Sequence, residues 1–270
     1  MSSFSLNIVN FKTKKYLIEL LKSIREDVGA FTDPYEINIL ENASGDDLSD
    51  LKIIFKDLPL VIFNSPKNLG FGGGHNLLAT KSKYNVIIIA NPDAQIIEPA
   101  TIKRLLHHLE NNPKVSIVGP RLLTMEHNYF VAVDEAQRLY KAGQFIQQKW
   151  DHGDSLPIMM NFADRLGIAR FCQHSTLSEV IWVSGAFCVI RRNDFNEIGG
   201  FDESFFFYNE ETDLSFRLRQ QGKIILYDPS ICVAHFYNAS LGHNTWKARY
   251  YRWISFLPYW KKNLLKKINV

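Results

Sequence analysis

The chain has 270 residues and is 46% hydrophobic, enough to bury the core of one α/β domain or of two fused half-domains. It has no run of about 18 or more apolar residues and no charged start followed by an apolar stretch, so we expect neither a membrane span nor a signal peptide. Cys172, Cys188 and Cys232 are odd in number and lack CxxC spacing, which disfavours a disulfide framework or zinc site and favours a reducing cytosol.

The net charge of +3 is distributed unevenly along the chain. Residues 236–270 contain seven Lys or Arg and no Asp or Glu, so residues 1–235 carry 24 basic against 28 acidic side chains. A general nucleic-acid-binding protein more often spreads basic residues over its main domain. The charge pattern therefore disfavours nucleic acid as a partner and sets the C-terminal segment apart.

The first half alternates short β-branched runs with amphipathic stretches. The predicted strands are Ser5–Asn10, Glu36–Leu40, Leu60–Phe63, Val86–Ala90 and Val115–Gly119. The predicted helices are Lys14–Arg25, Ser49–Lys56, His75–Lys83 and Ala100–Glu110. This alternation predicts an open, mostly parallel sheet with helices on both faces.

The second half is less regular. The segment Arg121–Glu179 has too weak a periodicity for elements to be assigned. Beyond it we predict a strand over Ile181–Arg191, a short helix capped by Asn193 and ending at Gly199, a helix over Glu211–Gln221 and a strand over Ile224–Tyr227. No repeat or linker interrupts the chain, so we expect one compact unit with a tail.

Polar residues follow the predicted strands of the first half. These segments are Phe11–Lys12, Glu41–Ser44, Asn64–Gly74 and Asn91–Asp93. Ligands of open α/β sheets bind beyond the carboxyl ends of the strands. We therefore expect the chemistry to be gathered at that rim.

The segment Asn91-Pro92-Asp93 directly follows the most apolar strand. A carboxylate at such a position, beside a diphosphate, is a suitable ligand for Mg²⁺ or Mn²⁺. Asn-Pro-Asp is also an ordinary turn sequence, and locally the turn is the simpler interpretation.

Three further segments could carry chemistry. Phe71–Asn76 is rich in glycine and could let a backbone approach an anion, or could be only a tight connection. Tyr208–Asp213 holds three acids that could serve a helix dipole or, near the aromatic residues before them, supply a general base. His235 follows the apolar run Ile231–Ala234 and matters only if it lies near Asp93.

In order, these segments resemble glycosyltransferase family 2, specifically its rhamnosyltransferase-like branch with the GT-A fold. The similarity extends over about Leu6 to Ser240. It is carried by IVNFK, ILENASGDD, NSPKNLGFGGGHN, IIIANPDAQI, WVSGAFCVIRRNDFNEIGGFDESFFFYNEETDLSFRLRQQG and VAHFYNAS. The resemblance implies one GT-A domain over residues 1–235, with a nucleotide-sugar-binding half (1–95) and an acceptor half (96–235), followed by a basic aromatic extension (236–270).

The resemblance also implies roles for matching positions. Asp93 would hold Mg²⁺ or Mn²⁺ on the donor diphosphate with help from His235, and Glu211, beside Glu210, would be the catalytic base. The expected donor-binding residues are Asn10, Glu41, Asn42, Asn68, Gly70, Asn76 and Asn91. Trp182 and Asp202 would border the acceptor. Asn91, Glu41 and Glu211 each stand where the family more often has Asp, which puts full activity in question.

The function implied is inverting transfer of a sugar from a nucleoside-diphosphate sugar to a hydroxyl of a glycan or lipid-linked oligosaccharide in cell-surface polysaccharide synthesis. The donor best matching the branch is dTDP-rhamnose, followed by UDP-hexoses. A nucleotidyltransferase making the sugar nucleotide, or an inactive relative that binds it, remains an alternative. A nucleotidyltransferase would need a basic, glycine-rich loop after the first strand, which Asn10–Thr13 does not provide.

The C-terminal extension predicts a location. Its aromatic residues are Trp246, Tyr250, Tyr251, Trp253, Phe256, Tyr259 and Trp260, interleaved with Lys247, Arg249, Arg252, Lys261 and Lys262. Rings and cations together suit the headgroups of an anionic bilayer. We expect a cytoplasmic protein attached peripherally to the inner face of the cell membrane, unless this segment is a helix packed on the domain.

Overall fold

The structure is a computed structural model that describes residues 3–29, 31–125, 130–148, 151–153, 174–205 and 209–236. In this part of the chain, a ten-stranded sheet has the order β3-β2-β1-β4-β11-β6-β12-β5, with β7 pairing with β6 and β9 with β12. Its strands are β1 (Phe4–Asn10), β2 (Tyr35–Glu41), β3 (Leu60–Asn64), β4 (Val86–Ala90), β5 (Ala94–Ile96), β6 (Val115–Thr124), β7 (Ile146–Gln147), β9 (Ser178–Glu179), β11 (Phe187–Arg191) and β12 (Ile224–His235). The short strands β8 (His152–Gly153) and β10 (Trp182–Val183) form a separate antiparallel pair.

The sheet is mixed but mostly parallel, as predicted. Strands β3, β2, β1 and β4 are parallel neighbours, and β6 is parallel to β12. Between these groups β11 runs antiparallel to both β4 and β6. Strands β4 and β6 run in the same direction, because each is antiparallel to β11, and β12 is parallel to β6. Strands β4, β6 and β12 therefore all end at the same edge of the sheet.

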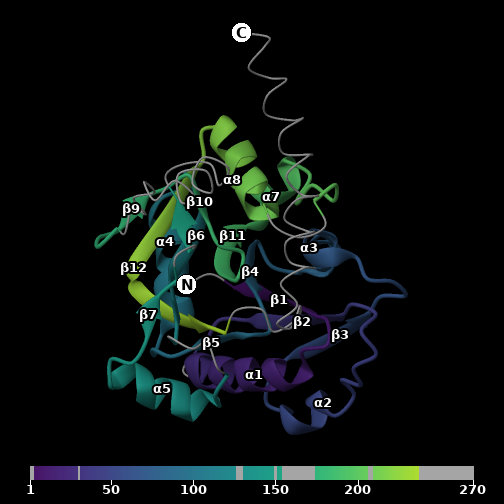
Figure 1. Cartoon of the computed structure of the whole chain (residues 1–270). Coiled ribbons are helices and arrows are strands. Elements are labelled where there is room, and N and C mark those ends of the chain that lie inside the picture. Colours follow the sequence, from purple (N-terminus) through teal and green to yellow (C-terminus); the bar gives the residue numbers. More distant parts are fainter. Residues whose placement is uncertain are drawn as a thin grey trace, which may run out of the picture.

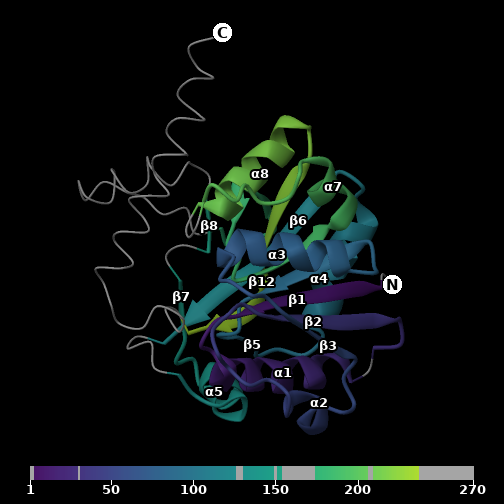
Figure 2. The same cartoon turned by 90° about the vertical axis from the view of Figure 1, so that its right-hand side faces the viewer.

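Helices cover both faces of the sheet (Figures 1 and 2). The helices are α1 (Lys14–Val28), α2 (Leu51–Ile54), α3 (Gly70–Lys81), α4 (Thr101–Asn111), α5 (Val133–Lys141), α7 (Arg192–Glu197) and α8 (Glu210–Gln220). Residues of α1, α2 and α4 share one core cluster, and residues of α3, α7 and α8 share another on the opposite face.

Strand β4 shows why these faces form. Ile88 and Ala90 pack into the core with α1, whereas Ile87 and Ile89 pack into the core with α3 and α8. Successive side chains of a strand point to opposite faces, so a strand covered on both sides must be apolar throughout. The unbroken run VIIIA meets that requirement.

Helix α3 begins at Gly70, five residues before the predicted start at His75. Glycine has a low helix propensity, which is why the sequence indicated a loop. Packing explains the difference: a Cβ on Gly74 would lie 2.8 Å from Cγ2 of Val9 in β1. The glycines therefore let the helix lie directly on the sheet.

Other boundaries also differ from the prediction. The expected strand Ile181–Arg191 is divided into β10 and β11, because the chain turns at Gly185-Ala186. The expected strand Ile224–Tyr227 continues to His235 along β6 with an irregularity between Asp228 and Cys232. The short helix α7 starts at Arg192, so Asn193 lies inside it and does not cap it.

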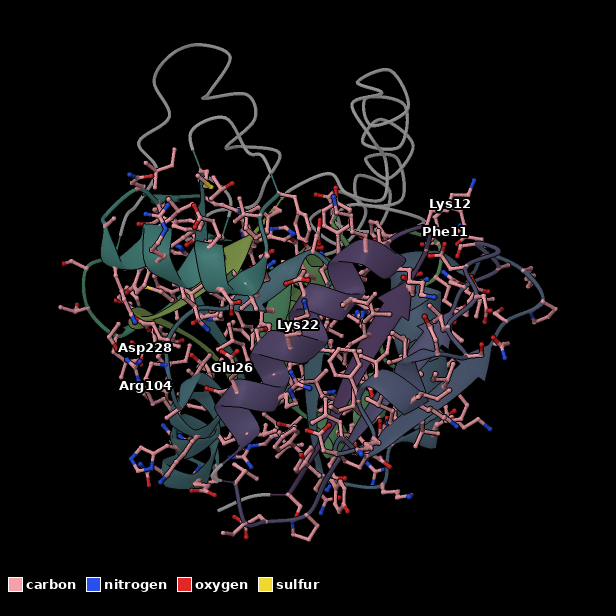
Figure 3. The ribbon with its side chains drawn as sticks, turned by 90° about the horizontal axis from the view of Figure 1, so that it is seen from below. Phe11, Lys12, Lys22, Glu26, Arg104 and Asp228 are labelled. Carbon is pink, nitrogen blue, oxygen red and sulfur yellow. The ribbon has the colours of Figure 1, made fainter. Side chains whose placement is uncertain are left out.

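The rim that follows β1 lies apart from the edge where α4 meets β12. Figure 3 shows Phe11 and Lys12 together just beyond the carboxyl end of β1, and Arg104 near Asp228 at a distant edge. Arg104 donates to the Ser230 carbonyl at 2.7 Å, and Asp228 is 2.7 Å from His108. These contacts hold α4 against β12, away from the rim that follows β1.

In the described part of the chain, no helix is long and apolar enough to cross a membrane. Cys188 and Cys232 are free, buried thiols. Cys172 and the basic aromatic segment 237–270 lie outside the described residues, and the division of the chain at residue 95 stays a prediction.

Candidate active site

The segment Asn91-Pro92-Asp93 is a turn fixed by main-chain hydrogen bonds at the end of β4. The Asn91 amide donates to the Ala186 carbonyl at 2.8 Å, and the Ala94 amide donates to the Asn91 carbonyl at 3.0 Å. The Phe236 amide donates to the Asp93 carbonyl at 2.9 Å. The turn therefore joins the start of β11 to the end of β12 and holds the side chain of Asp93 at the rim.

Asp93 and His235 lie side by side at this rim. Nε2 of His235 is 3.3 Å from Oδ1 of Asp93, and both side chains are largely buried. The pairing of His235 with Ala94 across β12 and β5 sets this proximity. Residues 142 positions apart in sequence are thus brought together by the sheet register, which their spacing alone did not reveal.

The donor atoms of this pair fit a divalent cation. Mg²⁺ in proteins is held by one or two carboxylates together with waters and substrate phosphates, and imidazole nitrogen favours a transition ion such as Mn²⁺ over Mg²⁺. Within the described residues no cluster of three or more His, Cys, Asp or Glu side chains could form a complete protein cage. The arrangement suits an ion that takes its remaining ligands from a diphosphate and water.

Glu210 and Glu211 open helix α8. The residue before them, Asn209, has φ 73°, a left-handed conformation that Asn tolerates better than most residues. Glu210 is 2% exposed, whereas Glu211 is partly exposed. Burial raises the pKa of both carboxyl groups, and the charge of Glu211 raises that of Glu210 further. Glu210 is thus the more deeply enclosed of the two acids, and Glu211 is the one that solvent reaches.

Glu211 lies close to the turn that carries Asp93. A Cβ on Gly185 would be 3.8 Å from Cβ of Glu211, and the next residue, Ala186, accepts the hydrogen bond from Asn91. Burial and the charge of Glu211 together raise the pKa of Cys188, two residues further, to about 12. The acid pair and the Asp93 turn thus flank the same short segment at the start of β11.

Asp213, the third acid of the cluster, has a structural role. It is 2% exposed, and its Oδ2 accepts a hydrogen bond from Nε of Arg217 at 2.6 Å. Arg217 also donates to the carbonyls of Ile198 and Gly200. Asp213 therefore anchors α8 to the chain after α7, which leaves Glu210 and Glu211 as the acids at the rim.

The expected donor-binding residues near β1 and β2 organise one loop system. Asn10 donates to Asp46 at 2.8 Å, and Glu41 accepts from the Ser44 amide at 2.7 Å. Asn42 donates to Asn68 at 3.1 Å and to the Gly70 carbonyl at 3.2 Å. These contacts order the ends of β1, β2 and β3 beside one another, and contact with a nucleotide stays a prediction for all five residues, Asn10, Glu41, Asn42, Asn68 and Gly70.

Asn76 bridges α3 and the loop that bears Asp202. Its Oδ1 accepts from the Phe201 amide at 2.8 Å, and its Nδ2 donates to the Phe201 carbonyl at 2.9 Å. In this structure the Asn76 side chain therefore positions the loop, and donor contact stays a prediction. Trp182 is buried in β10, and Oδ1 of Asp202 accepts from the Ser204 amide, so the acceptor roles of both are also still predictions.

Two polar residues near the site were not singled out from the sequence. His75 on α3 is 2% exposed and packs against Phe71 and Phe201, and burial lowers its pKa to about 3. Gln148 follows β7 and binds His235. His75 is part of the glycine-rich segment and could have been noticed there, but Gln148 lies in the stretch without periodicity and left no signal.

Comparisons with known proteins identify the family of this chain. A family model described as glycosyl transferase family 2 matches residues 5–199, more than half of the chain. The chain belongs to glycosyltransferase family 2. The rhamnosyltransferase-like branch of this family is also supported, because curated relatives carry rhamnosyltransferase names.

Three relatives illustrate the similarity. An N-acetylglucosaminyl-diphospho-decaprenol L-rhamnosyltransferase of Mycobacterium tuberculosis is 28% identical over 158 residues, 58% of this chain and 49% of the relative. The rhamnosyltransferase WbbL of Escherichia coli is 24% identical over 87% of this chain and 84% of the relative. The O-antigen chain rhamnosyltransferase RfbN of Salmonella typhimurium is 23% identical over 76% of this chain and 58% of the relative. The chain thus spans about half the length of the mycobacterial protein.

Solved structures show the GT-A fold that the sequence predicted. The structure of GalNAc-T7 with UDP, GalNAc and Mn²⁺ has a TM-score of 0.64 at 16% identity and covers 87% of this chain and 44% of its own. The mannosyltransferase PcManGT of Pyrobaculum calidifontis, in complex with GDP-Man and Mn²⁺, has a TM-score of 0.63 at 14% identity and covers 91% of this chain and 60% of its own. At these identities the likeness concerns the fold alone.

Proposed function

We propose that this protein is an inverting glycosyltransferase that moves a sugar from a nucleoside-diphosphate sugar to an acceptor hydroxyl. The observation that carries the proposal is the pair Asp93 and His235 at the end of β4 in a family 2 chain, with Glu211 beside the segment that is hydrogen-bonded to their turn. Asp93 and His235 are 3.3 Å apart, and Glu211 flanks the segment that hydrogen-bonds Asn91. Asp93 and His235 suit a cation bound to a diphosphate, and Glu211 suits a general base that takes the proton of the acceptor hydroxyl.

The residues would divide the work as follows. Asp93 and His235 would hold Mg²⁺ or Mn²⁺ on the donor diphosphate, where the ion supplies charge neutralisation for the leaving nucleoside diphosphate. Glu211 would accept the proton of the acceptor hydroxyl as that oxygen attacks the anomeric carbon from the opposite face. Glu210 is buried, so Glu211, which is partly exposed, is the acid that an acceptor could reach. One displacement inverts the anomeric centre.

The names of the relatives support a donor and an acceptor class. Relatives in three bacteria are rhamnosyltransferases, and one acts, by its name, on a diphospho-decaprenol carrying N-acetylglucosamine. We infer a dTDP-rhamnose donor, or failing that a UDP-hexose, and a glycan or lipid-linked acceptor. The basic aromatic extension 236–270 supports attachment to an anionic membrane surface, where a lipid-linked acceptor would lie.

Nucleotide binding tests the donor half of this proposal. We expect Mn²⁺ together with one of UDP, dTDP, GDP or ADP to raise the thermal midpoint by several degrees, because a ligand at about 100 times its Kd adds about 2.7 kcal/mol. Asp93→Ala should abolish the metal-dependent part of the shift. Asp57→Ala, at an exposed carboxylate before β3 and away from the rim, is the matched control and should keep it.

The outcomes separate the proposal from its alternatives. A shift that is equal with and without Mn²⁺, or that survives in Asp93→Ala, would remove Asp93 from its role. A normal metal-dependent shift without transfer to any acceptor would support an inactive, sugar-nucleotide-binding relative.

A further inference from the structure

Gln148 reaches from the end of β7 to the end of β12. Its main-chain amide donates to the Leu122 carbonyl of β6 at 2.8 Å, which fixes its backbone against the sheet. Its side chain meets His235 twice. Nε2 of Gln148 donates to the His235 carbonyl at 2.7 Å, and Oε1 of Gln148 is 3.1 Å from Nδ1 of the His235 ring.

These two contacts determine which ring nitrogen of His235 carries the proton. A main-chain carbonyl only accepts hydrogen bonds, so the NH₂ end of the Gln148 carboxamide must face it. The oxygen of the same carboxamide then faces Nδ1, and because that oxygen also only accepts, Nδ1 must donate. In a neutral imidazole the other nitrogen, Nε2, is then the one with the lone pair.

That lone pair is directed at Asp93. Nε2 of His235 lies 3.3 Å from Oδ1 of the carboxylate. Two electron-rich atoms facing each other are complementary to a cation that both can bind. Histidines that bind metals are commonly held by a hydrogen bond from the other ring nitrogen to an oxygen, which fixes the tautomer and the ring orientation. The Gln148 oxygen occupies that position here.

We propose that Gln148 is a positioning residue that fixes His235 in its Nδ1-protonated form and so prepares Nε2, with Asp93, for a divalent cation. This inference rests on the proposed function, in which the cation accompanies the donor diphosphate. Gln148 touches neither cation nor substrate in this scheme, and it acts only through His235.

Two measurements on the full-length chain test the proposal. The first is the tautomer of His235 in the metal-free protein, from long-range proton–nitrogen correlation spectra at one fixed pH. The second is Mn²⁺ affinity in the presence of the nucleoside diphosphate that gives the thermal shift. Gln148→Met keeps the side-chain length and removes both hydrogen bonds, and it should move the proton away from Nδ1 and weaken Mn²⁺ binding by about 10- to 100-fold.

Two control variants separate positioning from general loosening. Gln147→Met removes the neighbouring contacts with Asp151 and Tyr227 but leaves those to His235, so it should change Mn²⁺ affinity less than threefold. In a His235→Ala background, Gln148→Met should have no further effect on affinity, because its action runs through that ring.

The results distinguish this inference from the proposed function. If the wild-type protein binds Mn²⁺ but Gln148→Met binds it equally well, the assignment of Gln148 is wrong and the proposed function stands. A wild-type ring protonated at Nε2, or an equal loss of affinity in the His235→Ala background, would also overturn the assignment alone. A wild-type protein that binds no Mn²⁺ with any nucleoside diphosphate would overturn the proposed function itself.

Discussion

Glu210 and Glu211 are adjacent in sequence but differ in exposure to solvent and in the elements they lie beside. Glu210 is 2% exposed and lies beside α3, where a Cβ on Gly72 would be 3.7 Å from its Cγ. Glu211 is partly exposed and lies beside Gly185 at the rim. A base must be reachable by the acceptor, and Glu211 meets that condition better.

This difference predicts the effects of replacing each acid. Glu211→Gln should lower turnover by roughly 10²- to 10⁴-fold with little change in donor affinity, the usual contribution of a general base. Glu210→Gln should keep turnover within about tenfold, because its carboxyl group is buried and out of reach of an acceptor. Steady-state rates and donor Kd values for the two variants check this, and near-normal turnover of Glu211→Gln would transfer the role to Glu210.

At the residue scale, the sequence marked Asp93, His235, Glu210 and Glu211 as candidate site residues, but it did not show which of them lie side by side. Whether His235 meets Asp93 depends on the register of β12 against β5, which the sequence does not show. In the sequence Asp213 resembles the two acids before it, but in the structure it accepts a hydrogen bond from Arg217. Gln148 has no local pattern to mark it, since its importance comes only from the two bonds to His235.

At the element scale, helix α3 shows packing prevailing over propensity. Its glycines favour a loop in isolation, yet Gly72 and Gly74 are helical because the helix approaches the Phe201 loop and β1 too closely there for side chains. The strands were more predictable, because burial on both faces demands continuous apolar runs such as Val86–Ala90. Between residues 121 and 179, strands β7, β8 and β9 escaped prediction because two residues carry no periodicity. Helix α5 was also missed, although its buried Val133, Ala136 and Leu139 recur at helical spacing.

A pair of glycine variants tests the packing of α3. Gly74→Ala should destabilise the fold by about 1–3 kcal/mol, because its Cβ would lie 2.8 Å and 2.9 Å from the two methyl groups of Val9. Gly73→Ala, whose Cβ would lie 3.3 Å from Leu69 and 3.7 Å from the flexible Glu203 side chain, gains helix propensity and should change stability by less than about 1 kcal/mol. Urea unfolding measures both, and equal losses would show that α3 does not rest on β1 as described.

At the scale of the whole molecule, buried His75 links stability to pH. Burial lowers its pKa from 6.5 to about 3, so the folded protein holds this ring neutral. As pH falls below about 6.5, the unfolded chain binds a proton at His75 that the folded protein does not bind until about pH 3. Folding stability is therefore lost from this group as pH falls through that interval, and is fully retained above it.

Replacing His75 should remove this dependence. His75→Phe fits the aromatic surroundings of Phe71 and Phe201, and it should lose about 1–2 kcal/mol less stability than the wild type between about pH 7.5 and pH 5. His107→Gln, at an exposed histidine, should behave as the wild type. Denaturant unfolding at the two pH values provides the comparison, and parallel losses in all three proteins would contradict the buried, neutral state of His75.

The proposed function assigns metal-assisted, inverting transfer to one rim of this sheet. The most direct measurement is the proton NMR spectrum of the product formed from dTDP-rhamnose, or from UDP-hexoses, with a lipid-diphosphate N-acetylglucosamine acceptor. We predict a glycoside with inverted anomeric configuration, formed only when Mn²⁺ or Mg²⁺ is present. A product with retained configuration, or the same rate of formation in a chelator, would contradict the assignment of Asp93, His235 and Glu211 to a single displacement.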